Sequence, residues 1–118
     1  LFIEIKPTFS KKLLKKLLKE TSKFSKCTFI SFKHKNIYSL LKLKNNIKVG
    51  LSFSPPTSVK SIIKKSSNKK IDCLVMDKFY LKNKSIRSLK IKKYYYTIKT
   101  KIEFKKYSKD YNLIFENL

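Results

Sequence analysis

The sequence of 118 residues lacks alanine, glutamine and tryptophan altogether and contains a single glycine, Gly50. It also has little negative charge, because 7 Asp and Glu residues stand against 30 Lys and Arg residues and the formal net charge is +23. No apolar run reaches the roughly 18 residues that cross a bilayer, which excludes a membrane-spanning helix. The first residues, Leu1 to Lys6, lack the basic and then apolar order of a signal peptide. We therefore expect a cytoplasmic protein with no membrane span.

The excess of lysine first suggests a nucleic-acid or anionic-membrane partner. All basic residues except Arg87 are lysine, however, whereas base readout and bidentate phosphate contacts favour arginine. The abundance of Lys, Asn, Ile, Tyr and Phe is the residue set that an A/T-biased coding sequence imposes. Coding bias explains the lysines more economically than a ligand does. We therefore expect no specific nucleic-acid partner and lysines that are spread over outer helices.

The two cysteines, Cys27 and Cys73, each lie inside an apolar run. Neither has a neighbouring Cys or His at the spacing of metal ligands, so the sequence predicts buried free thiols. Free thiols are consistent with a reducing compartment.

Six short apolar segments recur along the chain at intervals of roughly 20 residues, which leaves room for a helix and two turns between neighbours. Several of these segments are apolar throughout, as is typical of parallel strands that are covered on both faces. The sequence therefore predicts an α/β fold of repeated β-α units. The predicted strands are residues 1–6, 27–32, 47–53, 71–76, 94–98 and 111–116.

The segments between the strands have the pattern of short amphipathic helices. In residues 11–20 the leucine pairs 13, 14 and 17, 18 form one apolar stripe, and Ser10 is placed as an N-cap. An amphipathic Lys/Leu segment can instead lie on an anionic membrane, but its short length between two strands favours an outer helix. Weaker patterns predict further helices around residues 37–41, 59–63, 86–89 and 102–107.

The first strand carries the clearest signal of a site. Alternation along a strand places Phe2, Glu4 and Lys6 on one face and Leu1, Ile3 and Ile5 on the other. A carboxylate and an ammonium group inside an apolar strand are either a structural ion pair or part of a functional site. In a parallel barrel, active sites form at the C-terminal strand ends, and this pair suits a hard cation and a phosphate oxygen.

The segment LFIEIKP is similar to the "EIK" strand of the glycerophosphodiester phosphodiesterase family, and later segments resemble that family in the same order. The resemblance covers residues 1–118 and implies the C-terminal portion of the barrel domain. The expected fold is a partial TIM-type (β/α)8 barrel of about six parallel β-α units, incomplete at the N-terminus. The later segments are TFISFKHKNIYSLLKL, NNIKVGLSFS, IDCLVMDKFYLKNKSIRSLK, YYYTIKT and NLIFENL.

The resemblance implies a phosphoric diester hydrolase that cleaves small glycerophosphodiesters to glycerol 3-phosphate and an alcohol. It implies that Glu4 binds a catalytic divalent cation, Ca or Mg, that Lys6 faces the substrate phosphate and that Tyr96 stands at the position of a usual Trp. Three positions depart from the family pattern: Lys99 replaces an Asn, and Glu116 and Leu118 replace an Asp and a Pro.

The family's catalytic histidines would precede residue 1, so we expect no catalytic residue in this chain and no cation bound by this chain alone. His34, the single histidine, is predicted to lie in a loop with a solvent-exposed role. The competing hypothesis is a small lysine-rich RNA-binding or ribosomal protein. In that case residues 94–96 would form a base-stacking platform rather than alternate between the two faces of a strand.

Overall fold

The computed structural model describes residues 1–115, and six strands form one sheet in the order β1 to β6. Every neighbouring pair of strands is parallel, which confirms the predicted α/β fold. Each strand overlaps its predicted segment, although residue 116 of the last segment lies outside the described residues. The strands are β1 (Phe2–Glu4), β2 (Thr28–Ser31), β3 (Lys48–Phe53), β4 (Cys73–Asp77), β5 (Lys92–Ile98) and β6 (Asn112–Phe115).

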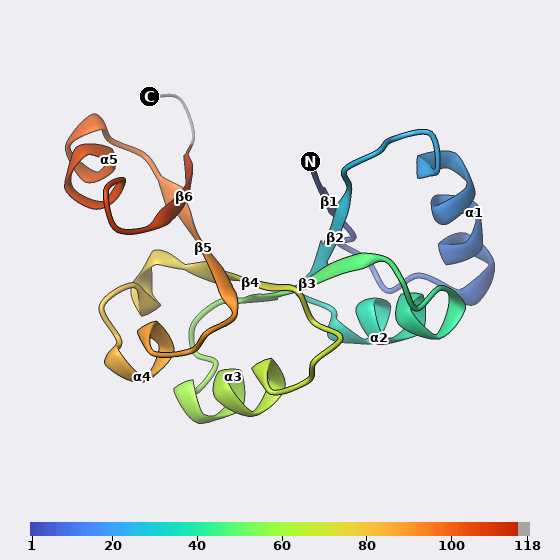
Figure 1. Cartoon of the computed structure of the whole chain (residues 1–118), viewed down its shortest axis with the longest axis horizontal. Coiled ribbons are helices and arrows are strands. Elements are labelled where there is room, and N and C mark those ends of the chain that lie inside the picture. The colour runs from blue at the N-terminus through green and yellow to red at the C-terminus, as the bar shows by residue number, and fades with distance from the viewer. Residues whose placement is uncertain (116–118) are drawn as a thin grey trace.

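Helical segments alternate with the strands and lie outside the sheet, which curls into a half-barrel (Figure 1). This architecture confirms the expected partial (β/α) barrel. Within the described residues, β1 and β6 each pair with one neighbour, so the sheet is open. The helical segments are α1 (Lys11–Thr21), α2 (His34–Leu43), α3 (Val59–Ser66), the 3-10 helix η1 (Lys78–Tyr80), α4 (Lys84–Arg87) and α5 (Lys101–Tyr107).

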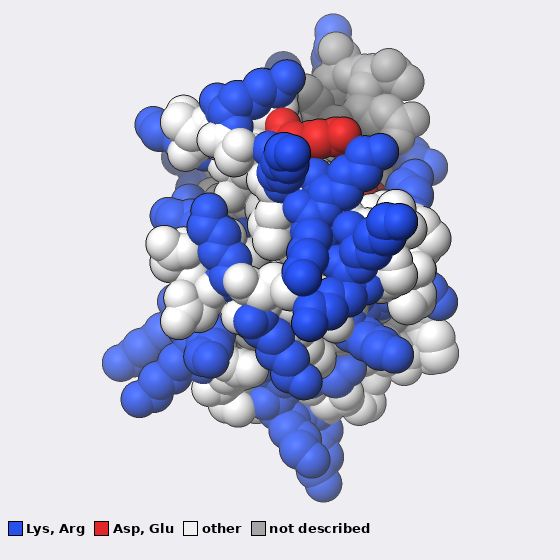
Figure 2. All heavy atoms as spheres, turned by 90° about the vertical axis from the view of Figure 1, so that its right-hand side faces the viewer, with Lys and Arg blue, Asp and Glu red and all other residues white. Residues whose placement is uncertain are grey.

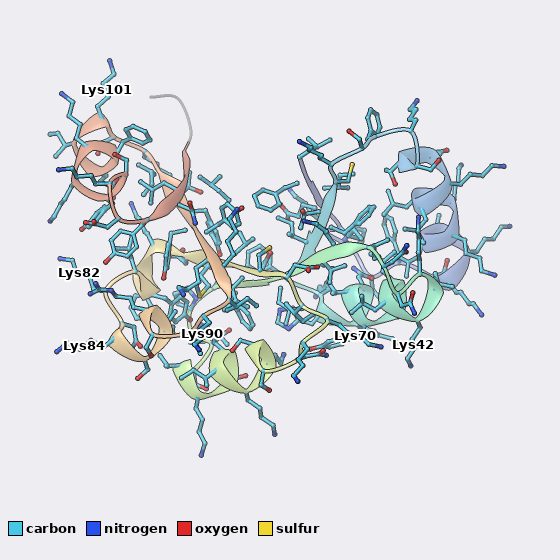
Figure 3. All side chains as sticks on the ribbon, viewed as in Figure 1. Lys42, Lys70, Lys82, Lys84, Lys90 and Lys101 are labelled. Atoms are coloured by element: carbon cyan, nitrogen blue, oxygen red, sulfur yellow. The ribbon has the colours of Figure 1, made fainter. Side chains whose placement is uncertain are left out.

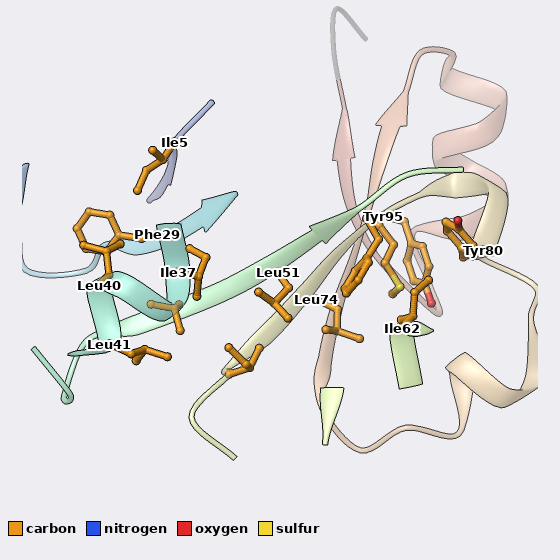
Figure 4. Close-up of a cluster of buried hydrophobic side chains, with 14 of the residues drawn as sticks. Ile5, Phe29, Ile37, Leu40, Leu41, Leu51, Ile62, Leu74, Tyr80 and Tyr95 are labelled. Atoms are coloured by element: carbon orange, nitrogen blue, oxygen red, sulfur yellow. The ribbon is translucent and has the colours of Figure 1, made fainter. Parts of the chain in front are cut away.

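The main hydrophobic core lies between the sheet and the helices, and we call it the outer cluster. Figure 4 shows Ile37 of α2 on the side of Leu51 of β3, and Ile62 of α3 near Leu74 of β4, and Leu40 of α2 belongs to the same cluster. All five side chains are fully buried. Their burial stabilises the protein because each apolar side chain removed from water contributes roughly 1.5–3 kcal/mol.

Helix α1 forms as its leucine pattern predicts. The hydroxyl oxygen of Ser10 accepts a hydrogen bond from the amide of Leu13 at 3.2 Å, which confirms Ser10 as the N-cap. Leu14 is fully buried in the outer cluster, whereas the neighbouring Leu13 is 48% exposed. The helix therefore packs through one stripe and presents its lysines to solvent.

The opposite side of the sheet carries a second, smaller cluster, which we call the inner face. The concave side of the half-barrel is therefore apolar near its middle. Gly50 of β3 allows the close packing there, because a Cβ atom at this position would lie 2.5 Å from the Sγ atom of Cys73. The inner face consists of Ile30, Cys73 and Val75, with Phe2, Tyr94, Tyr96 and Ile114 packed against them.

Both cysteines are free thiols, as predicted. Cys73 is buried in the inner face, and burial raises the pKa of its thiol to about 11. Cys27 is only half-buried, so the prediction of burial is wrong for this residue. Cys27 immediately precedes β2, at the end of the sheet where the strands begin.

Candidate functional site

The predicted site lies where the strands end on the concave side of the half-barrel. Glu4 is the last residue of β1, and Phe32 directly follows β2. Tyr96 lies in β5, where it pairs in register with Asp77, the last residue of β4. The rings of Phe32 and Tyr96 meet edge to face, with centroids 5.9 Å apart. The parallel topology therefore brings these residues to one rim, which we call the C-terminal rim.

A buried polar group holds the chain that leaves β1. The Asn36 amide nitrogen donates to the carbonyl oxygen of Pro7 at 2.8 Å, and its Oδ1 accepts from the amide of Phe9 at 2.9 Å. The hydroxyl of Ser31 donates to the carbonyl oxygen of Ile5 at 2.5 Å. These bonds fix the backbone on both sides of Lys6 and so position the rim residues of β1.

Glu4 and Lys6 are both exposed and do not form an ion pair with each other. Within residues 1–115 the Glu4 carboxylate makes no hydrogen bond or ion pair. A structural ion pair between these two residues is therefore not formed. The roles of Glu4 as a metal ligand and of Lys6 as a phosphate contact remain predictions.

Tyr96 is held rigidly at the rim. Its hydroxyl donates to the carbonyl oxygen of Phe53 at 2.8 Å. Burial is the main cause that raises the pKa of Tyr96 to about 12, and the nearby Asp77, Tyr80 and Glu4 contribute to the same shift because a second negative charge close by is unfavourable. The phenol is therefore neutral at physiological pH, and its hydroxyl proton is engaged with the backbone. Tyr96 can offer a flat apolar wall to a ligand.

The carboxylates of the described rim do not by themselves make a cation site. Residues 1–115 contain no group of three or more His, Cys, Asp or Glu side chains that could hold a metal ion. Asp77 uses its Oδ1 atom to accept a hydrogen bond from the amide of Phe79 at 2.8 Å. Glu4 thus fits the role of a single oxygen ligand, whereas Ca²⁺ or Mg²⁺ needs at least six.

His34 does not lie in a solvent-exposed loop, so that prediction is wrong. It begins α2, is half-buried, and packs edge to face on Phe53 of the outer cluster at 4.8 Å. Its Nε2 donates to the carbonyl oxygen of Ser52 at 2.8 Å, and its Nδ1 accepts from the Nζ of Lys65 at 2.9 Å. The sequence pattern missed this contact because Lys65 and Ser52 approach His34 only in the folded chain.

Desolvation by burial lowers the pKa of His34 from its ordinary 6.5; the bond to Ser52 opposes this effect, and the Lys65 ammonium adds to it. The unfolded chain therefore binds a proton at a higher pH than the folded chain. The contribution of neutral His34 to the free energy of unfolding is complete above pH 6.5. It is lost as the pH falls below that value and through the lowered folded pKa. We expect a lower urea midpoint at pH 5.5 than at pH 7.5.

The control for this pH effect is His34→Phe, because the chain has no other histidine. The variant is less stable at both pH values, since it loses the bonds to Ser52 and Lys65, but its midpoints at pH 5.5 and pH 7.5 coincide. Equal midpoints for the wild-type protein would contradict the expected titration.

A hollow lies at the other end of the strands. It has a volume of about 760 Å³ and is bordered by the first residues of β2, β3, β4 and β5. We call it the N-terminal hollow. Four lysines and one carboxylate line it: Lys26, Lys44, Lys48, Lys92 and Asp72.

The sequence predictions missed this hollow, although lysines at or near the starts of predicted strands indicate it. Lys48 and Lys92 are the first residues of their strands, and Lys26 precedes β2 by two residues. Because parallel strands begin at the same edge of a sheet, lysines at strand starts gather there. The expectation that the lysines are spread over the outer helices and not gathered in one groove therefore holds only for part of them, such as Lys42, Lys84 and Lys101, which project outward from three different helices (Figure 3).

The fold defines an α/β protein with a TIM-like half-barrel. Neither a scan against protein-family models nor a search of curated proteins finds a match for this chain. None of the helices within residues 1–115 is both long enough and apolar enough to cross a membrane.

Proposed function

We propose that this chain is the C-terminal part of a glycerophosphodiester phosphodiesterase barrel. The observation that carries the proposal is the carboxylate of Glu4, which is unpaired among residues 1–115 and stands at the C-terminal end of a parallel strand. Active sites of (β/α) barrels form at this end of the strands. An exposed carboxylate without a partner there is available to a cation.

Each rim residue has a distinct role in this proposal. Glu4 supplies one oxygen ligand to a divalent cation, which when bound polarises the phosphodiester. Lys6, two residues further along the chain and exposed, offsets the negative charge of the phosphate. Tyr96 lines the substrate side with its ring, because its hydroxyl already donates to Phe53.

Proton transfer is not assigned to any described residue. His34, the only histidine, packs on the helix side of the sheet and binds Ser52 and Lys65 through both ring nitrogens. A general acid or base must reach the substrate by hydrogen-bond distance, and both ring nitrogens of His34 already have partners within the protein. The proposed hydrolysis therefore needs groups beyond residues 1–115.

The experiment uses the protein expressed from its complete reading frame, with glycerophosphocholine as substrate and release of glycerol 3-phosphate as readout. Glu4→Gln keeps the side-chain shape and removes the charge, so we expect turnover at limiting Mg²⁺ or Ca²⁺ to fall at least about tenfold. Added cation should restore part of the loss. The matched control is Glu20→Gln on the exposed side of α1, which should leave turnover unchanged.

Lys6→Met should raise the KM for glycerophosphocholine and leave the cation dependence unchanged, in contrast to Lys12→Met on α1. Wild-type turnover of Glu4→Gln at limiting cation would show that Glu4 is not a ligand. Absence of hydrolysis by the wild-type protein at every cation concentration would contradict the proposed activity itself.

A further inference from the structure

The N-terminal hollow gathers positive charge that the described residues do not neutralise. Its four lysines are exposed at the hollow's wall. The ion pair formed within residues 1–115 is Lys78–Glu103, at the opposite end of the sheet's strands. The single carboxylate of the hollow, Asp72, accepts a hydrogen bond from the amide of Val49 at 2.8 Å. Four like charges in a concave site repel one another and attract anions.

Aromatic rings border the same hollow. Phe24, in the loop between α1 and β2, is 50% exposed. Tyr94 packs edge to face on Phe2 at 4.9 Å, and the Nζ of Lys92 lies 5.4 Å from the centroid of the Tyr94 ring. The hollow therefore combines flat apolar surface with ammonium groups. Nucleic-acid bases stack on such rings while lysines hold the phosphates.

We propose that the N-terminal hollow binds single-stranded RNA through its phosphates and through stacking of a base on Phe24. Lys44 and Lys48 hold phosphates on one wall, and Lys92 holds a phosphate on the wall beside Tyr94. Binding is not sequence-specific, because stacking and ammonium contacts do not distinguish bases.

Two features favour a strand of RNA over a flat lipid surface. The lysines and rings line a concavity of about 760 Å³, into which an extended chain fits and which a bilayer surface does not enter. Lysines are also present outside the hollow. The face that includes α1 is covered by basic side chains and has few carboxylates (Figure 2). A polymer longer than the hollow can use both surfaces.

This site is independent of the proposed phosphodiesterase activity. The hollow borders the first residues of the strands, whereas Glu4 and Tyr96 lie where the strands end. Glu4→Gln should therefore leave RNA affinity unchanged, and loss of RNA binding should leave hydrolysis unchanged.

The test measures fluorescence anisotropy of a labelled uridine oligonucleotide of about 12 nucleotides over a series of salt concentrations. In the triple variant Lys44→Gln, Lys48→Gln and Lys92→Gln, we expect affinity at low salt to fall by at least about tenfold. The slope of log affinity against log salt should decrease by about 2, since each phosphate contact to a single strand contributes roughly 0.7.

The matched control replaces three exposed lysines of the outer helices by glutamine, which removes the same charge: Lys60, Lys64 and Lys84. Its affinity should stay within about twofold of wild type. Equal losses in the two triple variants would mean that net charge alone attracts RNA, and would overturn the proposal.

Phe24→Ala separates stacking from charge. It should weaken oligouridine binding several-fold and leave binding of heparin unchanged, because heparin offers anionic groups without bases. Unchanged oligouridine affinity in this variant would overturn the stacking part. Binding of phosphatidylserine vesicles that depends on Lys44, Lys48 and Lys92, without RNA binding, would assign the hollow to a membrane instead and overturn the proposal.

Discussion

Gly50→Val should destabilise the protein by roughly 3 kcal/mol or more. A Cβ atom at this position would lie 2.5 Å from Cys73 Sγ, 3.1 Å from the Cys73 carbonyl oxygen and 3.2 Å from Ile30 Cγ2. Two of these contacts are with backbone or a branched side chain of the inner face, which cannot move aside. Urea unfolding followed by circular dichroism measures the loss.

A double-mutant cycle tests the cause of this loss. Gly50→Ala should cost about 1–3 kcal/mol, and Cys73→Ala in the same chain should recover part of that cost because it removes the nearest atom. The remaining contacts with the Cys73 carbonyl and Ile30 prevent full recovery. Strict additivity of the two single substitutions would show that the Sγ contact is not the cause.

Leu14→Ala should destabilise the protein by about 2–5 kcal/mol, because it leaves a cavity in the outer cluster. Leu14 is fully buried there. The control is Leu13→Ala, the same chemical change one residue earlier in α1, where the side chain is 48% exposed. Both variants gain the same helix propensity from alanine, so the difference between their unfolding free energies reports burial alone.

We expect Leu13→Ala to change the unfolding free energy by less than about 1 kcal/mol. Similar losses for Leu13→Ala and Leu14→Ala would show that α1 does not pack through one stripe. Such a result would also weaken the assignment of α1 as an outer helix of the half-barrel.

The strands and most helices could be predicted from the sequence because their signals are local. Apolar runs bounded by polar segments located all six strands, and the leucine spacing together with Ser10 located the start of α1. The η1 helix was not predicted. It follows β4 without a break and begins with a hydrogen bond from the amide of Phe79 to Asp77. A helix of three residues is too short to show the periodic spacing of apolar residues that predicts a helix.

The surroundings of the candidate site depended on contacts between distant segments, which a local pattern does not contain. Alternation correctly separated Glu4 from Ile5, which is buried in the outer cluster. The pattern could not reveal that Asn36, which lies 29 residues after Pro7, bonds to that residue's carbonyl. The lysines of the N-terminal hollow come from separate strands and connections, so the pattern within any one segment does not indicate that they meet.

The strand order β1 to β6 follows the chain without exception in residues 1–115. Each β-α unit therefore finds its partners among its neighbours in sequence, so little loop-closure entropy must be overcome before native contacts form. Folding can then spread from one unit to the next, as in a stack of repeats. The central strands β3 and β4 each pair with a neighbouring strand on both edges, whereas opening of β1 or β6 breaks the hydrogen bonds to one neighbour only. Amide exchange should therefore be slowest in the middle of the sheet and fastest at its two edges.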